Sequence, residues 1–177
     1  MQQPSKSRTL EVTVLSAENL RINGNPATKN IYVVVRAESI TSHTTATTGD
    51  GSGGGFHSWN EKLTVEMAMH AKSITFEVRC KTEIGVRDVG VARIAVSDFF
   101  GGLVPDQVLK FFSYGLRDWD GLRNGVINFS VRVVEPAVEE VEAVADSEKM
   151  VGATSSSSNN VVLGIPICWN NSTSSNI

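Results

Sequence analysis

The chain has 177 residues, of which 41% are hydrophobic and 20% are charged, and its formal net charge is −3. This composition is typical of a protein that buries a core and has one domain plus additional sequence. The lack of a basic excess argues against nucleic-acid binding, and no apolar run reaches the ~18 residues of a transmembrane helix.

The start of the chain and its cysteines favour a cytoplasmic location. No apolar signal-peptide core precedes the first predicted strand. The two cysteines, Cys80 and Cys168, lie in different parts of the chain, which favours free thiols in a reducing compartment over a disulfide framework.

Short segments that alternate apolar and polar side chains, or that are rich in β-branched residues, recur along the first 135 residues. They predict strands at 9–15, 31–36, 43–48, 59–66, 73–78, 89–96, 109–116 and 125–134. The best helical candidate is a single turn at 96–100, with Ser97 as its cap. Eight short strands without a long helix predict an all-β antiparallel sandwich or barrel.

The composition changes at Pro136. Residues 136–150 are rich in Glu, Ala and Val, and a Ser/Asn-rich stretch follows, so the sequence predicts a folded domain at 1–135 and a disordered tail at 136–177. The tail has five acidic residues and one lysine, a charge of −4, which leaves +1 for the domain.

One short stretch of the tail, residues 161–169, is apolar. Its large side chains are candidates for docking: Leu163, Ile165, Ile167 and Trp169. They could bind a protein partner or an edge of the domain itself, and the alternative is an adhesive stretch without a function.

Several motifs of the predicted domain resemble those of C2 domains. The opening strand reads LEVTVLSAENL at 10–20, NIYV follows at 30–33, WNE at 59–61 and VGVARIAV at 89–96. Together they cover residues 8 to about 135 in the order of that family. The resemblance implies an eight-stranded C2-type β-sandwich, and the strand order resembles the circularly permuted, type II arrangement.

Further motifs are similar to a plant subgroup of small C2 proteins, the copine-associated (bonzai-associated) proteins. They read SDF at 97–99, SYGLR at 113–117 and GVINFS at 125–130. The resemblance implies a peripheral membrane protein that binds phospholipid, in some members with calcium, and has a copine as its partner. It also implies a negative regulator of cell death, of plant defence and of the hypersensitive response, located at the inner face of the plasma membrane.

The family's calcium sites depend on loop aspartates, and this chain supplies few of them. The candidate ligands are Asn23, Asn25, Asn30, Glu83 and Asp88. Arg79 and Lys81 stand where the family has an Asp-x-Asp pair. A like charge at ~4 Å costs about 4 kcal/mol at an effective dielectric constant of about 20, so the ligand set is incomplete and calcium stays an open alternative.

The same substitutions suggest lipid binding without calcium. Arg79, Lys81 and Arg87 place three cations around one predicted loop, with Lys29 beside them, and Ile84 and Val86 lie near its tip. Each basic residue near an anionic membrane contributes about 1 kcal/mol, and apolar tip residues can insert. Alternatively, these are ordinary solvated surface residues.

No pattern in the sequence indicates catalysis. His43, His57 and His70 lack metal-ligand spacing and are interpreted as surface or edge residues. His57 and Ser58 are adjacent on a predicted strand, so their side chains point to opposite faces. The sequence therefore predicts a non-enzymatic adaptor that binds anionic phospholipid and a copine-like protein but no nucleic acid. The alternative is a protein-interaction module without lipid affinity.

Overall fold

A computed structural model describes residues 7–38, 41–49 and 54–134 of the chain. The strands are β1 (Ser7–Glu18), β2 (Arg21–Ile22), β3 (Asn25–Pro26), β4 (Ile31–Arg36), β5 (His43–Thr44), β6 (His57–Ala68), β7 (Ser73–Thr82), β8 (Gly85–Ala95), β9 (Lys110–Arg117) and β10 (Arg123–Val134). A short 3-10 helix, η1, spans Val96–Asp98. The described part of the chain has no helix that is long and apolar enough to cross a membrane.

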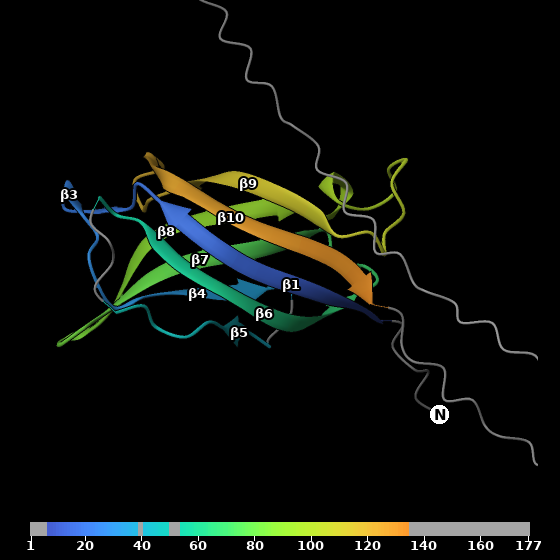
Figure 1. Cartoon of the computed structure of the whole chain (residues 1–177), viewed down its shortest axis with the longest axis horizontal. Helices are drawn as coiled ribbons and strands as arrows, with labels where there is room; N and C mark the ends of the chain where they lie inside the picture. The colour runs from blue at the N-terminus through green and yellow to red at the C-terminus, as the bar shows by residue number, and fades with distance from the viewer. Residues whose placement is uncertain (1–6, 39–40, 50–53, 135–177) are drawn as a thin grey trace, which may run out of the picture.

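Eight strands form two antiparallel layers that pack face to face (Figure 1). The strand order is β5-β4-β7-β8-β9-β10-β1-β6, and the only register pair recorded between β8 and β9 within the described residues is Val91 with Arg117. Because β8 and β9 are joined so weakly, the boundary between the two four-stranded layers lies between them. The strands β2 and β3 form a separate small ladder. The predicted β-sandwich is confirmed.

The first and last strands of the sandwich are neighbours. β1 lies between β10 and β6, and both pairings are antiparallel. This adjacency agrees with the type II arrangement predicted from the strand order.

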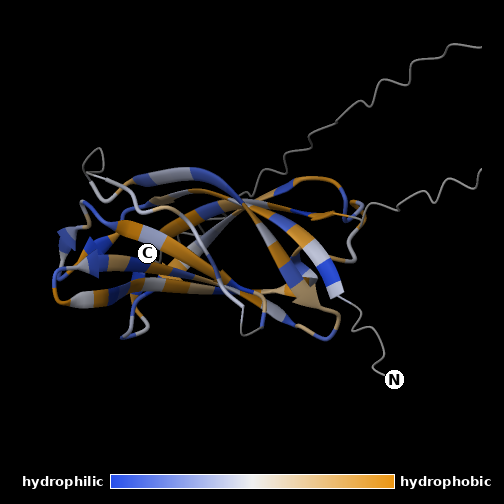
Figure 2. Cartoon of the chain, turned by 90° about the horizontal axis from the view of Figure 1, so that it is seen from below, coloured by the Kyte–Doolittle hydropathy of each residue, from blue (hydrophilic) through white to orange (hydrophobic). Residues whose placement is uncertain are grey.

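The core lies between the two layers because inward residues alternate with outward ones along each strand. Leu10, Val12 and Val14 of β1 are fully buried, and Figure 2 shows the alternation of hydrophobic and hydrophilic residues along the strands. Phe76 of β7 stacks on Phe129 of β10 with 4.3 Å between the ring centroids, so this aromatic pair joins the two layers. Truncating such a buried ring typically costs about 3–5 kcal/mol.

Some boundaries differ from the sequence prediction. β7 and β8 pair as far as Thr82 and Gly85, so residues interpreted as a loop are strand. The predicted cap at Ser97 is wrong, because Ser97 lies inside η1 and the N-cap is Ala95, which forms no side-chain capping bond.

The connections between strands gather at two ends of the sandwich. The loop end contains the connections 19–30, 45–49 with 54–56, 83–84 and 118–122, and lies at the left of Figure 1. The far end contains the connections 69–72 and 96–109 and the last residue of β10, Val134. The predicted docking residues Leu163, Ile165, Ile167 and Trp169 lie outside the described residues.

Candidate functional site

The loop end is organised by a buried amide, Asn124, at the start of β10. Its Oδ1 accepts the backbone N–H of Arg21 at 3.0 Å, and its Nδ2 donates to the carbonyl oxygens of Arg21 and Val89 at 2.9 and 2.7 Å. The side chain is 8% exposed, so these bonds replace water that the three backbone groups would otherwise need. Asn124 therefore joins the 19–30 connection to β8 and β10.

A second buried side chain, His57 at the start of β6, joins the 19–30 connection to the segment 45–49. Its Nε2 lies 3.0 Å from the carbonyl oxygen of Ala27, which can only accept, so Nε2 carries the proton. Its Nδ1 lies 2.9 Å from Oγ1 of Thr48. The prediction that His57 is a surface or edge residue is wrong, because both ring nitrogens have partners in the interior and the residue is 2% exposed.

The β7–β8 hairpin forms one tip of the loop end, apart from the β2–β3 turn (Figure 1). Its turn consists of Glu83 and Ile84, and the Thr82 hydroxyl donates to the Gly85 carbonyl oxygen at 2.8 Å across that turn. Gly85 has a φ of 140°, which favours glycine at this position. Ile84 is 100% exposed and Val86 is 58% exposed. The hairpin thus presents two apolar side chains to solvent, as predicted.

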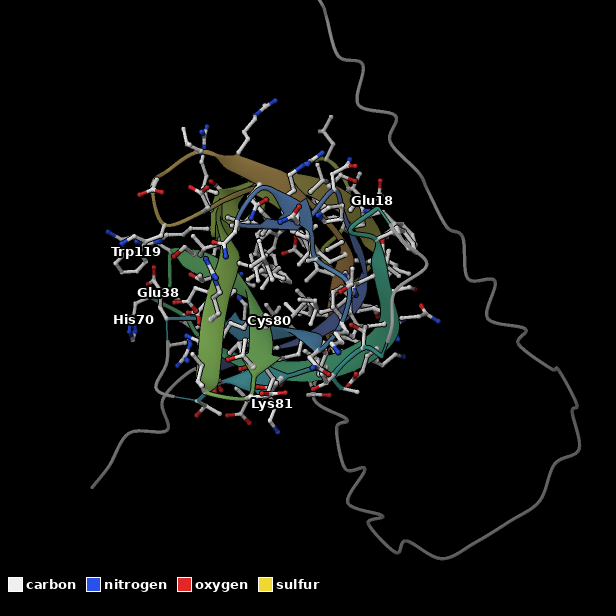
Figure 3. The ribbon with its side chains drawn as sticks, turned by 90° about the vertical axis from the view of Figure 1, so that its left-hand side faces the viewer. Glu18, Glu38, His70, Cys80, Lys81 and Trp119 are labelled. Carbon is white, nitrogen blue, oxygen red and sulfur yellow. The ribbon has the colours of Figure 1, made fainter. Side chains whose placement is uncertain are left out.

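The four predicted lipid-binding cations all lie at the loop end, on two faces of the hairpin and on the adjacent connection. Arg79 and Lys81 point to one face of β7, whereas Arg87 pairs in register with Cys80 and lies on the other face. Figure 3 looks onto the loop end and shows Lys81 at its periphery and Cys80 nearer the centre. Lys29 lies in the connection beside the hairpin and lines a groove with Lys81 and Ile84.

These cations differ in whether other side chains bind them. Arg79 forms ion pairs with Glu77 at 2.8 Å and with Asp88 at 3.0 Å, and Arg87 donates to Oδ1 of Asn23 at 2.6 Å. Within the described residues, no side-chain hydrogen bond or ion pair is recorded for Lys29 or Lys81. Lys29 and Lys81 are therefore the predicted cations whose side chains have no partner there. Arg87 also keeps its full charge, because the Asn23 amide is neutral, but its side chain is held in place.

The predicted calcium ligands do not form a fitting donor set. Asp88 is engaged by Arg79, and the Asn23 carbonyl by Arg87, so a calcium ion there would lie beside guanidinium groups. The Asn25 amide donates to the Asn23 backbone at 3.5 Å, the Asn30 carbonyl oxygen accepts from Lys81, and Glu83 is exposed at the hairpin tip. No cluster of three or more His, Cys, Asp or Glu side chains suited to a metal occurs in the described residues.

The structure adds an exposed apolar turn to the loop end that sequence reasoning missed. Asp118 accepts the N–H groups of Asp120 and Leu122 at 3.0 and 2.9 Å, which orders the β9–β10 turn. Trp119 is 91% exposed and Leu122 is 65% exposed on this turn, and Figure 3 shows Trp119 at the periphery of the loop end. The sequence does contain an indication of this exposed turn. The stretch DWDG at 118–121 is rich in turn-forming residues, so its Trp is not expected to lie in a core strand.

The chain matches the C2 domain family model over residues 8–111, and it belongs to that family. Its fold is also that of solved C2 domains. A C2 domain of plant Extended Synaptotagmin 1 matches with a TM-score of 0.58 and 18% identity, covering 75% of this chain and 96% of that one. A C2 domain-containing protein from a putative elicitor-responsive gene matches with a TM-score of 0.59 and 18% identity, covering 79% and 99%.

Among curated proteins, the chain is similar to BON1-associated protein 2 of Arabidopsis thaliana. The two are 39% identical over 130 residues, which is 71% of this chain. The chain spans 61% of the length of that relative. This similarity confirms the predicted resemblance to the bonzai-associated C2 proteins.

Proposed function

We propose that the chain is a non-catalytic C2 adaptor that binds the anionic inner face of a membrane through its loop end. The observation that carries the proposal is the β7–β8 hairpin, where a fully exposed Ile84 stands beyond Lys29 and Lys81. An apolar tip with cations behind it matches the layering of a bilayer, in which hydrocarbon lies beneath an anionic headgroup layer.

The electrostatic part of the proposed binding depends on lysines whose charge is not already paired. Each basic side chain near an anionic surface contributes about 1 kcal/mol, so Lys29 and Lys81 together contribute about 2 kcal/mol. Arg79 contributes less, because Glu77 and Asp88 already face its guanidinium group. The pair of lysines thus directs the hairpin toward acidic lipid.

The apolar part of the proposed membrane binding comes from two exposed turns. Ile84 and Val86 on the hairpin, and Trp119 and Leu122 on the β9–β10 turn, are exposed at the same end of the sandwich. Trp is suited to the interface between headgroups and hydrocarbon, because its ring is apolar and its N–H remains hydrated. Two insertion points would orient the domain with the strands pointing away from the membrane.

Calcium is not required in this account. The arginines that engage Asn23 and Asp88 supply positive charge at positions where a C2 calcium site would use the ion. Lipid binding therefore proceeds by direct cation–headgroup attraction and depends on ionic strength.

Co-sedimentation with vesicles containing phosphatidylserine tests the proposal, with phosphatidylcholine vesicles as the reference. The Lys29→Gln/Lys81→Gln chain should bind about 2 kcal/mol more weakly, roughly thirty-fold. The matched control is Lys72→Gln, which removes an exposed lysine outside the loop end that has no ion pair among the described residues, and it should change affinity much less. Equal loss in both variants, or no binding by the natural chain, would reject the lipid proposal.

We also propose a copine-like protein as the partner of this adaptor, with a role in restraining cell death and defence responses. The name of the Arabidopsis relative records an association with BON1, and the similarity covers most of this domain. If the natural chain binds a copine but no vesicles, the chain is instead a protein-interaction module without lipid affinity.

A further inference from the structure

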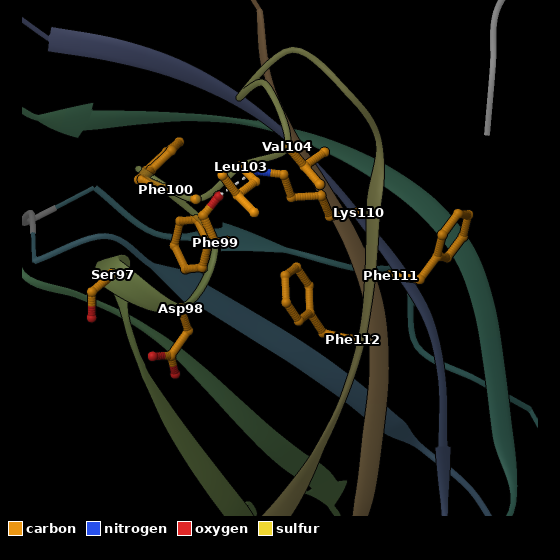
Figure 4. Close-up of a pocket in the computed structure, with 10 residues that line it drawn as sticks. Ser97, Asp98, Phe99, Phe100, Leu103, Val104, Lys110, Phe111 and Phe112 are labelled. Carbon is orange, nitrogen blue, oxygen red and sulfur yellow. Dashed lines mark hydrogen bonds between the residues drawn. The ribbon is translucent and has the colours of Figure 1, made fainter. Parts of the chain in front are cut away.

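An apolar groove of about 420 Å³ lies at the far end of the sandwich, opposite the proposed membrane-binding surface. Its walls are the rings and aliphatic side chains of the β8–β9 connection and of β9. Figure 4 shows these residues around the opening: Phe99, Phe100, Leu103, Val104 and Phe112. Leu103 is fully exposed, so its side chain extends the apolar lining of the groove out to solvent.

The charged groups around this groove already have partners. Nζ of Lys110 donates to the Phe99 carbonyl oxygen at 2.7 Å (Figure 4). It also lies 3.6 Å from Oδ1 of Asp106. The Asp98 carboxylate accepts the Tyr114 hydroxyl at 2.7 Å. Lys110 and Asp98 would therefore keep their partners when an apolar segment occupies the groove.

The chain leaves the folded domain beside this groove. The N–H of Val133, near the end of β10, donates to the carbonyl oxygen of Asp106 at 2.9 Å, and Asp106 Oδ1 accepts the N–H of Gly101 at 3.4 Å. One hydrogen bond therefore joins the residue before Val134, the last described residue, to the connection that forms the groove wall.

The sequence beyond Val134 contains one suitable occupant at a suitable distance. Residues 161–169 read VVLGIPICW, and the 26 residues that precede them are mostly polar or small. A flexible linker of that length has a root-mean-square span of about 28 Å, which is comparable to the size of a small domain. A tethered segment of this kind meets its site at an effective concentration in the ~mM range.

We propose that the apolar segment 161–169 docks into the groove of its own chain, with Ile165, Ile167 and Trp169 against Phe100, Leu103 and Phe112. The occupant is this segment rather than a second copy, because the tether begins at the groove and supplies a local concentration that free chains do not reach. The docking leaves the loop end uncovered, so this inference and the proposed lipid binding succeed or fail separately.

Paramagnetic broadening in the full chain tests the docking. A nitroxide is attached to Ser172→Cys in a Cys168→Ser background. Cys80 is buried, and this burial raises the pKa of its thiol, so Cys80 reacts with the label more slowly than the exposed thiol introduced at residue 172. We expect the backbone amide signals of residues 101–104 to lose most of their intensity relative to the reduced label, while those of Ile84 and Trp119 do not change. Broadening at the loop end, or none in the domain, would overturn the proposal.

Variants on both surfaces separate docking from chance proximity. Ile165→Ser/Ile167→Ser should restore the signals of residues 101–104, and so should Leu103→Ser, which is tolerated because Leu103 is fully exposed. Leu122→Ser, an exposed leucine at the opposite end, is the matched control and should leave the broadening intact. Unchanged signals from β1 and β10 verify that each variant is folded.

A mixed sample distinguishes the tether from association between chains. Isotopically labelled chain without nitroxide is mixed with unlabelled chain that carries it. The proposal predicts no broadening in the mixture. Broadening equal to that in the singly prepared chain would show a second copy in the groove and would overturn the intramolecular assignment.

Discussion

Arg87 donates from Nη2 to the Oδ1 of Asn23 at 2.6 Å, and this contact ties the β7–β8 hairpin to the β2–β3 ladder. The two residues were predicted for different tasks, Arg87 for lipid and Asn23 for calcium. In the structure the two side chains bind each other, so the contact stabilises the shape of the loop end. It occupies the Asn23 oxygen and holds Arg87 in place, while Arg87 keeps its charge because the amide is neutral.

The first prediction concerns calcium. Because guanidinium groups engage both Asn23 and Asp88, vesicle binding should be equal in saturating calcium and in EGTA. Co-sedimentation under the two conditions is the measurement. A clear gain with calcium would mean that the ligand set forms despite the arginines.

The second prediction compares two cations on one strand. Arg79→Gln should weaken binding to phosphatidylserine vesicles less than Lys81→Gln, because Arg79 faces two carboxylates and Lys81 faces none in the recorded contacts. The Lys81 change should cost about 1 kcal/mol, roughly five-fold in affinity. An Arg79 variant that binds as weakly as the Lys81 variant would show that pairing does not decide the contribution.

The third prediction concerns the amide that organises the loop end. Asn124→Ala leaves the N–H and carbonyl of Arg21 and the carbonyl of Val89 without their partner, so the free energy of unfolding should fall by about 2–4 kcal/mol. Urea denaturation measures this change. The control Asn25→Ala removes an exposed amide and should change stability by less than about 0.5 kcal/mol. Equal stability of the two variants would contradict the assigned role.

The fourth prediction concerns acid stability at the far end. The Ser73 hydroxyl and the Lys72 N–H both donate to Glu38, and with Arg93 they lower the pKa of that carboxyl from 4.5 to about 2. A depressed pKa gives stability that is present above pH 4.5 and is lost as the pH falls toward 2. Glu38→Gln should therefore flatten the fall in unfolding free energy across this window. An unchanged profile in the variant would assign the acid sensitivity to other groups.

Much of the fold was predictable because burial patterns are local. The strand at 31–36 and the core rings Phe76 and Phe129 follow directly from β-branched and alternating sequence. The hairpin at 79–88 was interpreted as a loop because both of its faces are solvent-exposed near the tip and it lacks an apolar face to mark it. Backbone hydrogen bonds between β7 and β8 extend these strands to the tip, and such bonds leave no apolar pattern in the sequence.

The candidate site was only partly predictable, because pairing in space decides what a charge can do. The sequence located Lys29, Lys81 and Ile84 at one end correctly, but Arg79 is neutralised by Glu77, and this depends on the strand placing both side chains on one face. Trp119 was missed because an isolated aromatic in a turn has no periodicity to follow.

The depth of the hairpin tip in a membrane tests the central claim most directly. A nitroxide at Ile84→Cys, in a Cys168→Ser background and bound to phosphatidylserine vesicles, should show contact with oxygen in the hydrocarbon and protection from an aqueous relaxing agent. The same label at Met69→Cys, an exposed residue at the far end and outside the groove, should remain in water. A label at residue 84 that stays aqueous, or one at residue 69 that enters the lipid, would contradict the assignment of the membrane-binding end.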